Sequence, residues 1–274
     1  MPGEDLESAL GATAALAKEG IGTVLTNLGE RVTSPKEAAA VREHYATVLD
    51  SVCDRGLPAQ ISVKLTHLGL DVDRAVCTGS VLALAARAAD TGSFLWIDME
   101  ESSYVDATLD VFRRARAAHP NVGVCLQAYL RRTPADLAAL VPLAPAIRLV
   151  KGAYREPPEV AFPKKRETDA AYLELTHTLL DRAARGGALP VFGTHDTRLV
   201  EQVRRRAEAL AIAPRGYEFH MLYGIKAAEQ RALAARGATV RVLVSYGTHW
   251  FPWYMRRLAE RPANLWFVVR NLVP

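Results

Sequence analysis

Two adjacent arginines near the end of the chain are the side chains with the clearest capacity to bind a ligand. Arg256, Arg257 and Glu260 fall in the stretch W-Y-M-R-R-L-A-E-R-P-A-N, residues 253–264. Apolar residues at near-helical spacing predict a helix here, and Pro262 ends it. Residues three and four apart are neighbours on a helix, so both arginines and the glutamate share its polar side. Paired guanidinium groups suit a carboxylate ligand, and a solvated helix face with an internal ion pair is the alternative.

The rest of the chain alternates between short apolar strands and amphipathic helices. The predicted helices span residues 6–18, 35–55, 73–88, 105–118, 136–141, 169–185, 198–210, 225–236 and 251–261. The predicted strands span residues 23–28, 60–65, 94–97, 122–129, 147–150, 190–193, 217–222 and 239–244. The longest predicted loop, 153–168, is rich in proline.

This alternation predicts the fold class. Continuous strand–helix alternation implies parallel strands, and eight such units in 274 residues predict a TIM-like (β/α)8 barrel. A doubly wound sheet is the competitor, but it usually carries a glycine-rich phosphate turn after its first strand. The corresponding N-L-G at 27–29 is no such turn, and no change in composition marks a linker. We therefore expect one domain over residues 1–274.

Composition argues against several classes of protein. Half of the residues are apolar, enough for a large core, and the net charge of +4 is spread along the chain. The basic runs at 164–166 and 204–206 lack interleaved aromatics, so we expect no nucleic-acid partner. Three cysteines without a C-x-x-C pair favour a reducing compartment. The acidic N-terminus is unlike a signal peptide, and no apolar run reaches the ~18 residues of a membrane span. We expect a cytoplasmic protein with at most peripheral membrane contact.

Polar residues gather where the predicted strands end. In a (β/α)8 barrel the chemistry lies at the carboxyl ends of the strands, where the loops meet. The residues at these positions are Lys64, Asp98, Gln127, Arg148 with Lys151, Thr194 with His195, and His220. Because most of the charged groups are cationic and Arg256 and Arg257 follow the last strand, the site suits an anionic substrate or cofactor.

Two other chemistries remain open from the residues alone. A metal hydrolase would use His195, His220 and Asp98, but two scattered histidines are weak support for a site that needs three or more ligands, so we expect no metal. A lyase would use Lys64 or Lys151 as an uncharged amine that attacks a carbonyl and forms a Schiff base. The alternative for each lysine is an ion pair or a phosphate contact.

Seven motifs spread over most of the chain resemble those of the proline dehydrogenase family. They are K-L-T at 64–66, D-M-E-E at 98–101, L-Q-A-Y at 126–129, R-L-V-K-G-A-Y at 148–154, T-H-D at 194–196, F-H-M-L-Y-G at 219–224 and R-R-L-A-E-R-P-A-N at 256–264. The resemblance implies a distorted (βα)8 barrel that binds FAD. It also implies oxidation of L-proline to Δ1-pyrroline-5-carboxylate, by hydride transfer from substrate C5 to flavin N5, with the electrons passed on to a quinone.

The resemblance also implies roles for the substrate-binding and catalytic residues. Arg256 and Arg257 would grip the substrate carboxylate, and Glu260 would orient them or meet the substrate amine. Leu222 would pack on the substrate ring. Lys64 would lie in the same pocket, paired with Asp98, and Asp98 would order the pocket together with Tyr154. Arg148 would place a positive charge near flavin N5, which favours the reduced flavin.

A second set of residues would hold the cofactor. Gln127 would hydrogen-bond the isoalloxazine ring, and Gly152 would let the backbone approach the cofactor closely, because it has no Cβ. The other implied contacts are Met99, Val150, Ala153 and Tyr154 around the flavin, and Lys151, Thr194 and His195 at the ribityl, phosphate or adenine parts.

Two positions depart from the family pattern. Trp253 stands where the family usually has a tyrosine that closes over the substrate, and Leu243 stands where it often has another tyrosine. Both positions belong to the family's substrate pocket. They predict either that proline is retained with compensating changes, or that a flavin dehydrogenase of the same family acts on a different proline-like or amine substrate.

Overall fold

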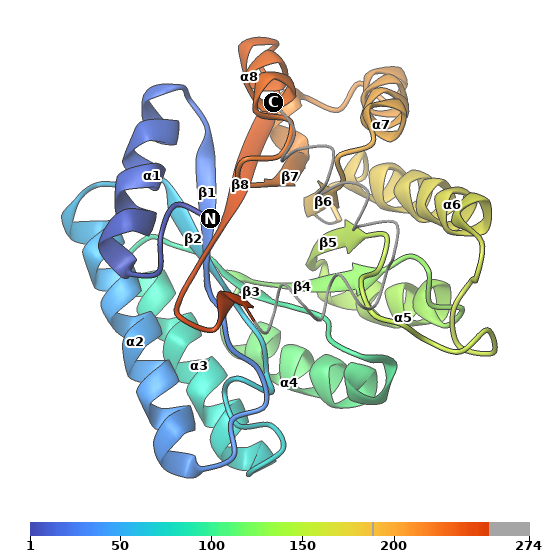
Figure 1. Ribbon diagram of the computed structural model, residues 1–274. Helices are drawn as coiled ribbons and strands as arrows, with labels where there is room; N and C mark the ends of the chain where they lie inside the picture. Colours follow the sequence, from blue (N-terminus) through green and yellow to red (C-terminus); the bar gives the residue numbers. More distant parts are fainter. Residues whose placement is uncertain (188, 252–274) are drawn as a thin grey trace.

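A closed barrel of eight parallel strands, arranged in sequence order, forms the centre of the molecule (Figure 1). The computed structural model describes residues 1–187 and 189–251. The strands are β1 (Gly22–Asn27), β2 (Ala59–Val63), β3 (Leu95–Ile97), β4 (Val122–Gln127), β5 (Ala146–Val150), β6 (Leu189–Gly193), β7 (Glu218–Leu222) and β8 (Thr239–Tyr246). β8 closes the barrel by pairing with β1 from Gly22↔Arg241 to Asn27↔Tyr246. The predicted (β/α)8 fold is confirmed.

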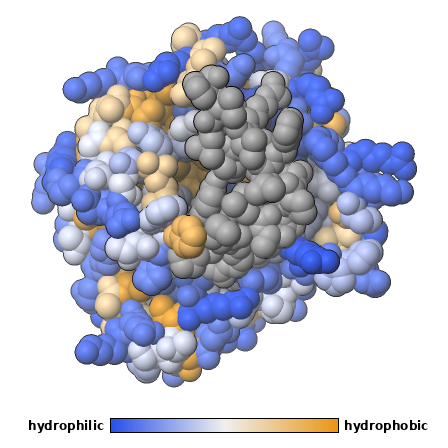
Figure 2. Space-filling view, in the orientation of Figure 1, coloured by the Kyte–Doolittle hydropathy of each residue, from blue (hydrophilic) through white to orange (hydrophobic). Residues whose placement is uncertain are grey.

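Helices cover the outside of the barrel. They are α1 (Leu6–Lys18), α2 (Pro35–Asp54), α3 (Arg74–Asp90), α4 (Val105–Ala118), α5 (Thr133–Leu140), α6 (Lys165–Ala183), α7 (Thr197–Ala209) and α8 (Ala227–Ala235). Short 3₁₀ turns η1 (Ser102–Tyr104), η2 (Val141–Leu143) and η3 (Pro214–Gly216) precede α4, β5 and β7. The helices turn polar faces outward, and the surface in Figure 2 is largely hydrophilic.

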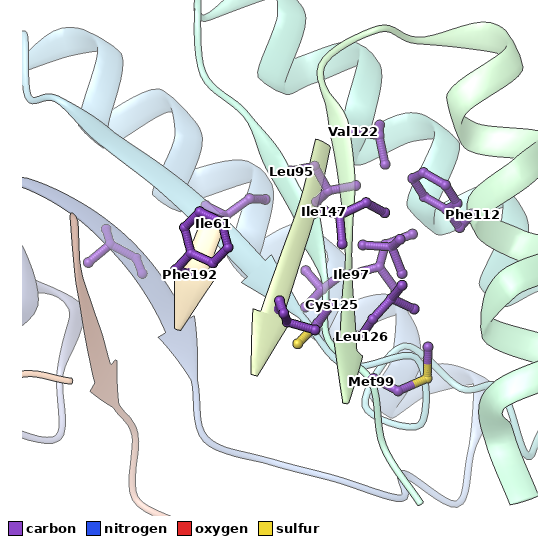
Figure 3. Packing of buried hydrophobic residues seen from close by; sticks show 14 of the residues in the cluster. Ile61, Leu95, Ile97, Met99, Phe112, Val122, Cys125, Leu126, Ile147 and Phe192 are labelled. Carbon is purple, nitrogen blue, oxygen red and sulfur yellow. The ribbon is translucent and has the colours of Figure 1, made fainter. Parts of the chain in front are cut away.

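The apolar core has two layers because alternate strand residues face opposite sides of the sheet. The larger layer lies between the sheet and the helices; Figure 3 shows Leu95, Ile97 and Leu126 on the side that faces Phe112 of α4. The smaller layer comes from the other set of strand positions, which face the barrel interior. It contains Val24, Trp96, Ala146 and Val191, with Leu243 packed against them.

Several predicted boundaries differ from the structure by two residues or more, and three of them have a clear local cause. α6 begins at Lys165 rather than 169, because the Glu167 side chain accepts a hydrogen bond from the backbone N–H of Lys164 and caps the helix. β4 ends at Gln127 rather than 129, because a turn follows in which Thr133 donates its hydroxyl to the Gln127 carbonyl at 2.6 Å. α5 starts at Thr133 rather than 136, with a proline in its first turn.

The predicted final helix, 251–261, falls almost wholly outside the described residues. For this reason the single domain over residues 1–274 remains a prediction. Within the described part of the chain, no helix is both long and apolar enough to cross a membrane.

Candidate active site

Four polar side chains meet inside the carboxyl-terminal end of the barrel. Arg148 of β5 is only 4% exposed, and its Nη2 donates to the Ser62 hydroxyl at 2.9 Å and to Asp98 Oδ1. The Ser62 hydroxyl in turn donates to Asp98 Oδ1 at 2.9 Å. Lys64 Nζ lies 3.8 Å from Asp98 Oδ2. The cluster therefore holds two cations and one carboxylate, which leaves an excess positive charge at the barrel mouth.

Strand alternation explains how these residues come together. Ile61 and Val63 of β2 pack in the outer layer, so Ser62 and the following Lys64 face the interior. The same rule turns Trp96 and Asp98 inward from β3, and Arg148 inward from β5. Parallel strands of a closed barrel bring these inward positions to the same depth.

Trp96 supports Arg148 from within the barrel. The guanidinium carbon of Arg148 lies 5.1 Å from the centroid of the Trp96 ring, a cation–π distance. The ring is fully buried, and its Nε1 donates to Gln60 Oε1 at 2.7 Å. Gly123 leaves space for it, since a Cβ there would stand 2.5 Å from the indole. Arg148 is thus fixed by a ring, a hydroxyl and a carboxylate.

The predicted flavin contacts lie at the ends of β4 and β5. Gln127 donates from Nε2 to the Glu100 carbonyl at 2.9 Å, and its Oε1 accepts from the Ala153 N–H at 3.3 Å. Gly152 has φ +120°, and a Cβ there would stand 2.2 Å from the Tyr129 ring. The immediate reason for this glycine is therefore the packing of Tyr129, which adds to the expected approach of a cofactor. Met99 and Tyr154 are buried, and Val150 is half-buried.

Lys151 is held by carboxylates of two helices. Its Nζ lies 2.6 Å from Asp169 Oδ1 on α6 and 3.3 Å from Asp196 Oδ2, the N-cap of α7. Burial raises the pKa of Asp196, but hydrogen bonds from Arg198 and Lys151 outweigh it and bring the value to about 2. The cation at the end of β5 is therefore matched by ionised carboxylates at neutral pH.

His195 follows β6 and is engaged with β7. Its Nε2 accepts the backbone N–H of Leu222 at 2.8 Å, so its proton sits on Nδ1. Burial lowers its pKa to about 4, so the ring is neutral at pH 7. The adjacent Thr194 is buried. This hydrogen bond fixes the backbone of Leu222, whose side chain is 38% exposed. The resemblance assigns that side chain to the substrate wall.

The structure corrects the expectation for His220. It lies in the middle of β7 rather than at its end, and Nε2 stands 3.0 Å from Glu218 Oε2. Glu218 also accepts from Arg241 Nε at 2.9 Å, so the ring is part of a buried network inside the barrel. Burial also raises the pKa of Cys125, consistent with an inert thiol. In residues 1–187 and 189–251, no group of three or more His, Cys, Asp or Glu side chains could hold a metal ion.

An apolar hollow of about 540 Å³ opens beside the ends of β7 and β8. Leu222 and Leu243, both assigned to the substrate wall, line it together with Tyr223 and Ser245. The chain's first residues reach the same hollow, where Glu4 Oε1 accepts from Trp250 Nε1 at 2.6 Å. The N-terminus lies near β1 and β8 in Figure 1.

Some predicted site residues lie outside the described part of the chain, and others were missed. Trp253, Arg256, Arg257 and Glu260 belong to the first group, so their roles remain predictions. Sequence reasoning did not assign a role in the site to Ser62, Trp96 or Glu100. A signal for Ser62 did exist, because it precedes Lys64 by two residues on a strand with an apolar opposite face.

These features define a class of protein. A closed (β/α)8 barrel with a buried Arg–Asp pair and a lysine at the carboxyl ends of its strands has the architecture of a barrel enzyme whose site carries an excess of positive charge.

Comparisons with known proteins identify the family. The family model described as "Proline dehydrogenase" matches residues 9–270. Proline dehydrogenase 1 of Bacillus subtilis subsp. natto is 35% identical over 271 residues, which cover 99% of this chain and 88% of that protein. Proline dehydrogenase of Deinococcus radiodurans is 37% identical over 279 residues with the same coverage. The chain belongs to the proline dehydrogenase family and is an oxidoreductase of that type.

Solved structures of longer proteins contain the same barrel. Proline utilization A from Bdellovibrio bacteriovorus, inactivated by N-propargylglycine, superposes with a TM-score of 0.83 at 25% identity, over 90% of this chain. A proline utilization A structure with proline bound in remote sites gives a TM-score of 0.79 at 25% identity, over 94% of this chain. The present chain spans 30% of the length of each of these proteins.

Proposed function

We propose that this protein oxidises L-proline to Δ1-pyrroline-5-carboxylate with FAD as its cofactor. The observation that carries the proposal is the buried Arg148–Asp98 pair with Lys64 beside it, at the carboxyl ends of the strands of a barrel of this family. An excess of positive charge in a water-poor site favours a substrate carboxylate and an anionic cofactor.

The residues present fit FAD. Gly152 and Ala153 offer backbone close to Gln127. Lys165 and Arg198 also pair with the two carboxylates that hold Lys151, so this cluster keeps one positive charge in excess, which suits phosphate groups. Met99, Val150 and Tyr154 would line the flavin, and Thr194 and His195 would meet its more distant parts. Bound FAD would supply the hydride acceptor, with N5 receiving hydrogen from C5 of proline.

The chain's own groups bind the substrate and fix the charge around it. Arg256 and Arg257 would bind the substrate carboxylate, and Glu260 would orient this arginine pair. Lys64, oriented by Asp98, would face the same carboxylate. Leu222 would pack on the proline ring. Arg148 holds a fixed positive charge that needs no reorganisation, because its partners already position it. Such a charge stabilises the extra electron density that a reduced flavin carries.

A Schiff-base lyase on the same barrel is disfavoured by the surroundings of both lysines. Attack on a carbonyl needs an uncharged amine. Lys151 lies within 3.3 Å of two carboxylates and Lys64 lies 3.8 Å from Asp98, so both amines are engaged in ion pairs. Family membership points the same way.

A second substrate class is favoured by one observation. The hollow of about 540 Å³ beside Leu222 and Leu243 leaves apolar space next to the substrate wall. A larger proline-like amine would fill such a space, and Trp253 would alter the same wall. The reaction would remain a flavin-dependent dehydrogenation.

For the electron acceptor we propose a membrane quinone, reached from the cytoplasm by peripheral contact at the inner face of the membrane. This part of the proposal rests on the family resemblance. Steady-state assays with a soluble quinone, compared with oxygen, would test it: quinone reduction by proline supports it, and turnover with oxygen alone contradicts it.

Anaerobic titration of the purified protein tests the substrate and the cofactor together. We expect a yellow protein whose flavin absorbance bleaches with L-proline and whose activity is lost with N-propargylglycine, the compound that inactivated the Bdellovibrio protein. Bleaching by a larger analogue but not by proline would favour the second substrate class. A protein that cannot be loaded with FAD would overturn the flavoenzyme proposal.

A further inference from the structure

Hydrogen bonds join residues at or just past the carboxyl ends of five consecutive strands. After β1, the Val32 N–H donates to the Thr66 carbonyl, 3.2 Å away in the segment after β2. Thr66 donates its backbone N–H to Glu100 Oε1 at 3.0 Å, and Glu100 follows β3. The Glu100 carbonyl then accepts from Gln127 of β4, which accepts from Ala153 after β5. We call this chain of contacts the rim belt.

Glu100 is the centre of the rim belt because it uses both its side chain and its backbone. Its second carboxyl oxygen, Oε2, accepts a hydrogen bond from the Thr66 hydroxyl, so both carboxyl oxygens bind Thr66, which follows β2. Its carbonyl grips the Gln127 amide on the other side. The residue is 2% exposed, and Thr66 is fully buried. Burial of a carboxyl group with two specific donors is costly to maintain without those contacts.

We propose that Glu100 is a positioning residue that sets the distance between the substrate-binding lysine and the cofactor cradle. Lys64 lies two residues before Thr66, and the Gln127–Ala153 contact forms the cradle. In this proposal Glu100 acts through its hydrogen bonds to Thr66 and Gln127 and not by contact with substrate or cofactor. The assignment of Lys64 and Gln127 to these two sides rests on the proposed function.

The electrostatic surroundings of Glu100 identify the conservative replacement. Burial raises its pKa to about 7 against the opposing effect of Thr66 and Lys64, while Glu30 adds to the rise. Burial raises the pKa of the Cys77 thiol on α3, and the negative charge of Glu100 adds to this rise. Either protonation state offers an acceptor to the Thr66 N–H and a partner to its hydroxyl. A glutamine offers the same two groups, so Glu100→Gln keeps the rim belt and Glu100→Ala breaks it.

Kinetics of these variants, loaded with FAD, give the first test. We expect Glu100→Ala to lower kcat/KM for proline roughly 10- to 100-fold and to weaken FAD binding, because sub-ångström displacements of reacting groups are costly. Glu100→Gln should stay within about threefold of the parent, since its hydrogen-bonding groups match. Equal losses in both variants, or parent-like kinetics in Glu100→Ala, would overturn the proposal.

Thr66→Val and Thr108→Val form a matched pair. Each replaces a fully buried hydroxyl by a methyl group, but Thr66 donates to Glu100, whereas the Thr108 hydroxyl on α4 has no hydrogen-bond partner among the described residues. Thr66→Val should therefore share the direction of the Glu100→Ala effect, and Thr108→Val should leave kcat/KM unchanged. A loss of equal size in both would mean that packing alone explains it.

Amide hydrogen exchange separates this proposal from the proposed function, because it needs no substrate. In Glu100→Ala the amides of Thr66 and Ala153 should exchange at least about tenfold faster, and in Glu100→Gln neither should change. Faster exchange at the Thr66 amide without a change at the Ala153 amide would contradict the proposal that Glu100 connects the ends of β2 and β5. If proline fails to bleach the parent protein, the proposed function fails, and the exchange result still decides the role of Glu100.

Discussion

At the scale of single residues, Arg148 has the most constrained surroundings in the described site. It is almost fully buried, donates to Asp98 and Ser62 and lies over Trp96. A planar guanidinium can use two donors and a ring face at once, whereas an ammonium is a hydrated point charge on a flexible stem. We therefore expect the site to require the shape of arginine as well as its charge.

Arg148→Lys should lower the rate of anaerobic flavin reduction by proline by roughly 100-fold, because the charge remains but loses its fixed position. Stopped-flow absorbance measures this rate, and circular dichroism checks the fold. Arg113→Lys is the control, since Arg113 pairs with Asp110 on the exposed face of α4. A parent-like rate in Arg148→Lys would show that positive charge alone is sufficient.

At the scale of elements, the segments after the strands carry out two tasks each. Asp196 caps α7 by accepting the Arg198 N–H at 3.2 Å, and it also holds Lys151. Tyr129, just past β4, packs against Gly152, just past β5. Strand ends therefore supply site residues and also fix one another, so local changes in one loop are expected to move its neighbour.

Gly152→Ala tests this dependence at one position. Its φ of +120° is unfavourable for alanine, and the new methyl group would collide with Tyr129. We expect a loss of roughly 2 kcal/mol or more in the free energy of unfolding and weaker FAD binding, measured by urea denaturation and fluorescence titration.

Gly79→Ala is the matched control for that substitution. Gly79 lies inside α3, and a Cβ there would meet nothing within 4 Å. Alanine should therefore stabilise the protein by about 0.5–1 kcal/mol through its helix propensity. If Gly152→Ala behaved like Gly79→Ala, the contact with Tyr129 would not be the reason for the glycine.

At the scale of the whole molecule, buried neutral histidines should make stability depend on pH. Burial lowers the pKa values of His67, His195 and His220 to about 4. In the unfolded chain histidine titrates near 6.5. Between about pH 4 and 6.5 the unfolded state therefore binds more protons, so stability rises with pH across this window and is fully present above it.

His220→Gln should reduce that dependence. His220 is buried against Glu218, and its share amounts to roughly 3 kcal/mol between the two ends of the window. The urea midpoint, measured at several values between pH 4 and 7, should change less steeply in the variant. His177→Gln on the exposed face of α6 serves as the control and should keep the parent slope. An unchanged slope in His220→Gln would mean that folding does not lower the pKa of this ring.

The sequence alone determined the order of the elements and the class of fold. Apolar periodicity depends only on near neighbours, so α1 and α4 are found with the predicted bounds and all eight strands occur where alternation indicated them. Several boundaries differ, and those of β4, α5 and α6 depend on side-chain caps and turns that periodicity does not report. Motifs identified the family for the same reason, because they are contiguous.

Only the tertiary structure decided which side chains meet. Arg148 and Ser62 are 86 positions apart, and Thr66 and Glu100 are 34 apart, so no local pattern links them. Closure of the barrel sets the register of each strand against the next, and this register places Trp96 under Arg148 and Glu100 between Thr66 and Gln127. The residue types are written in the sequence, but their contacts follow from how eight strands close on one another.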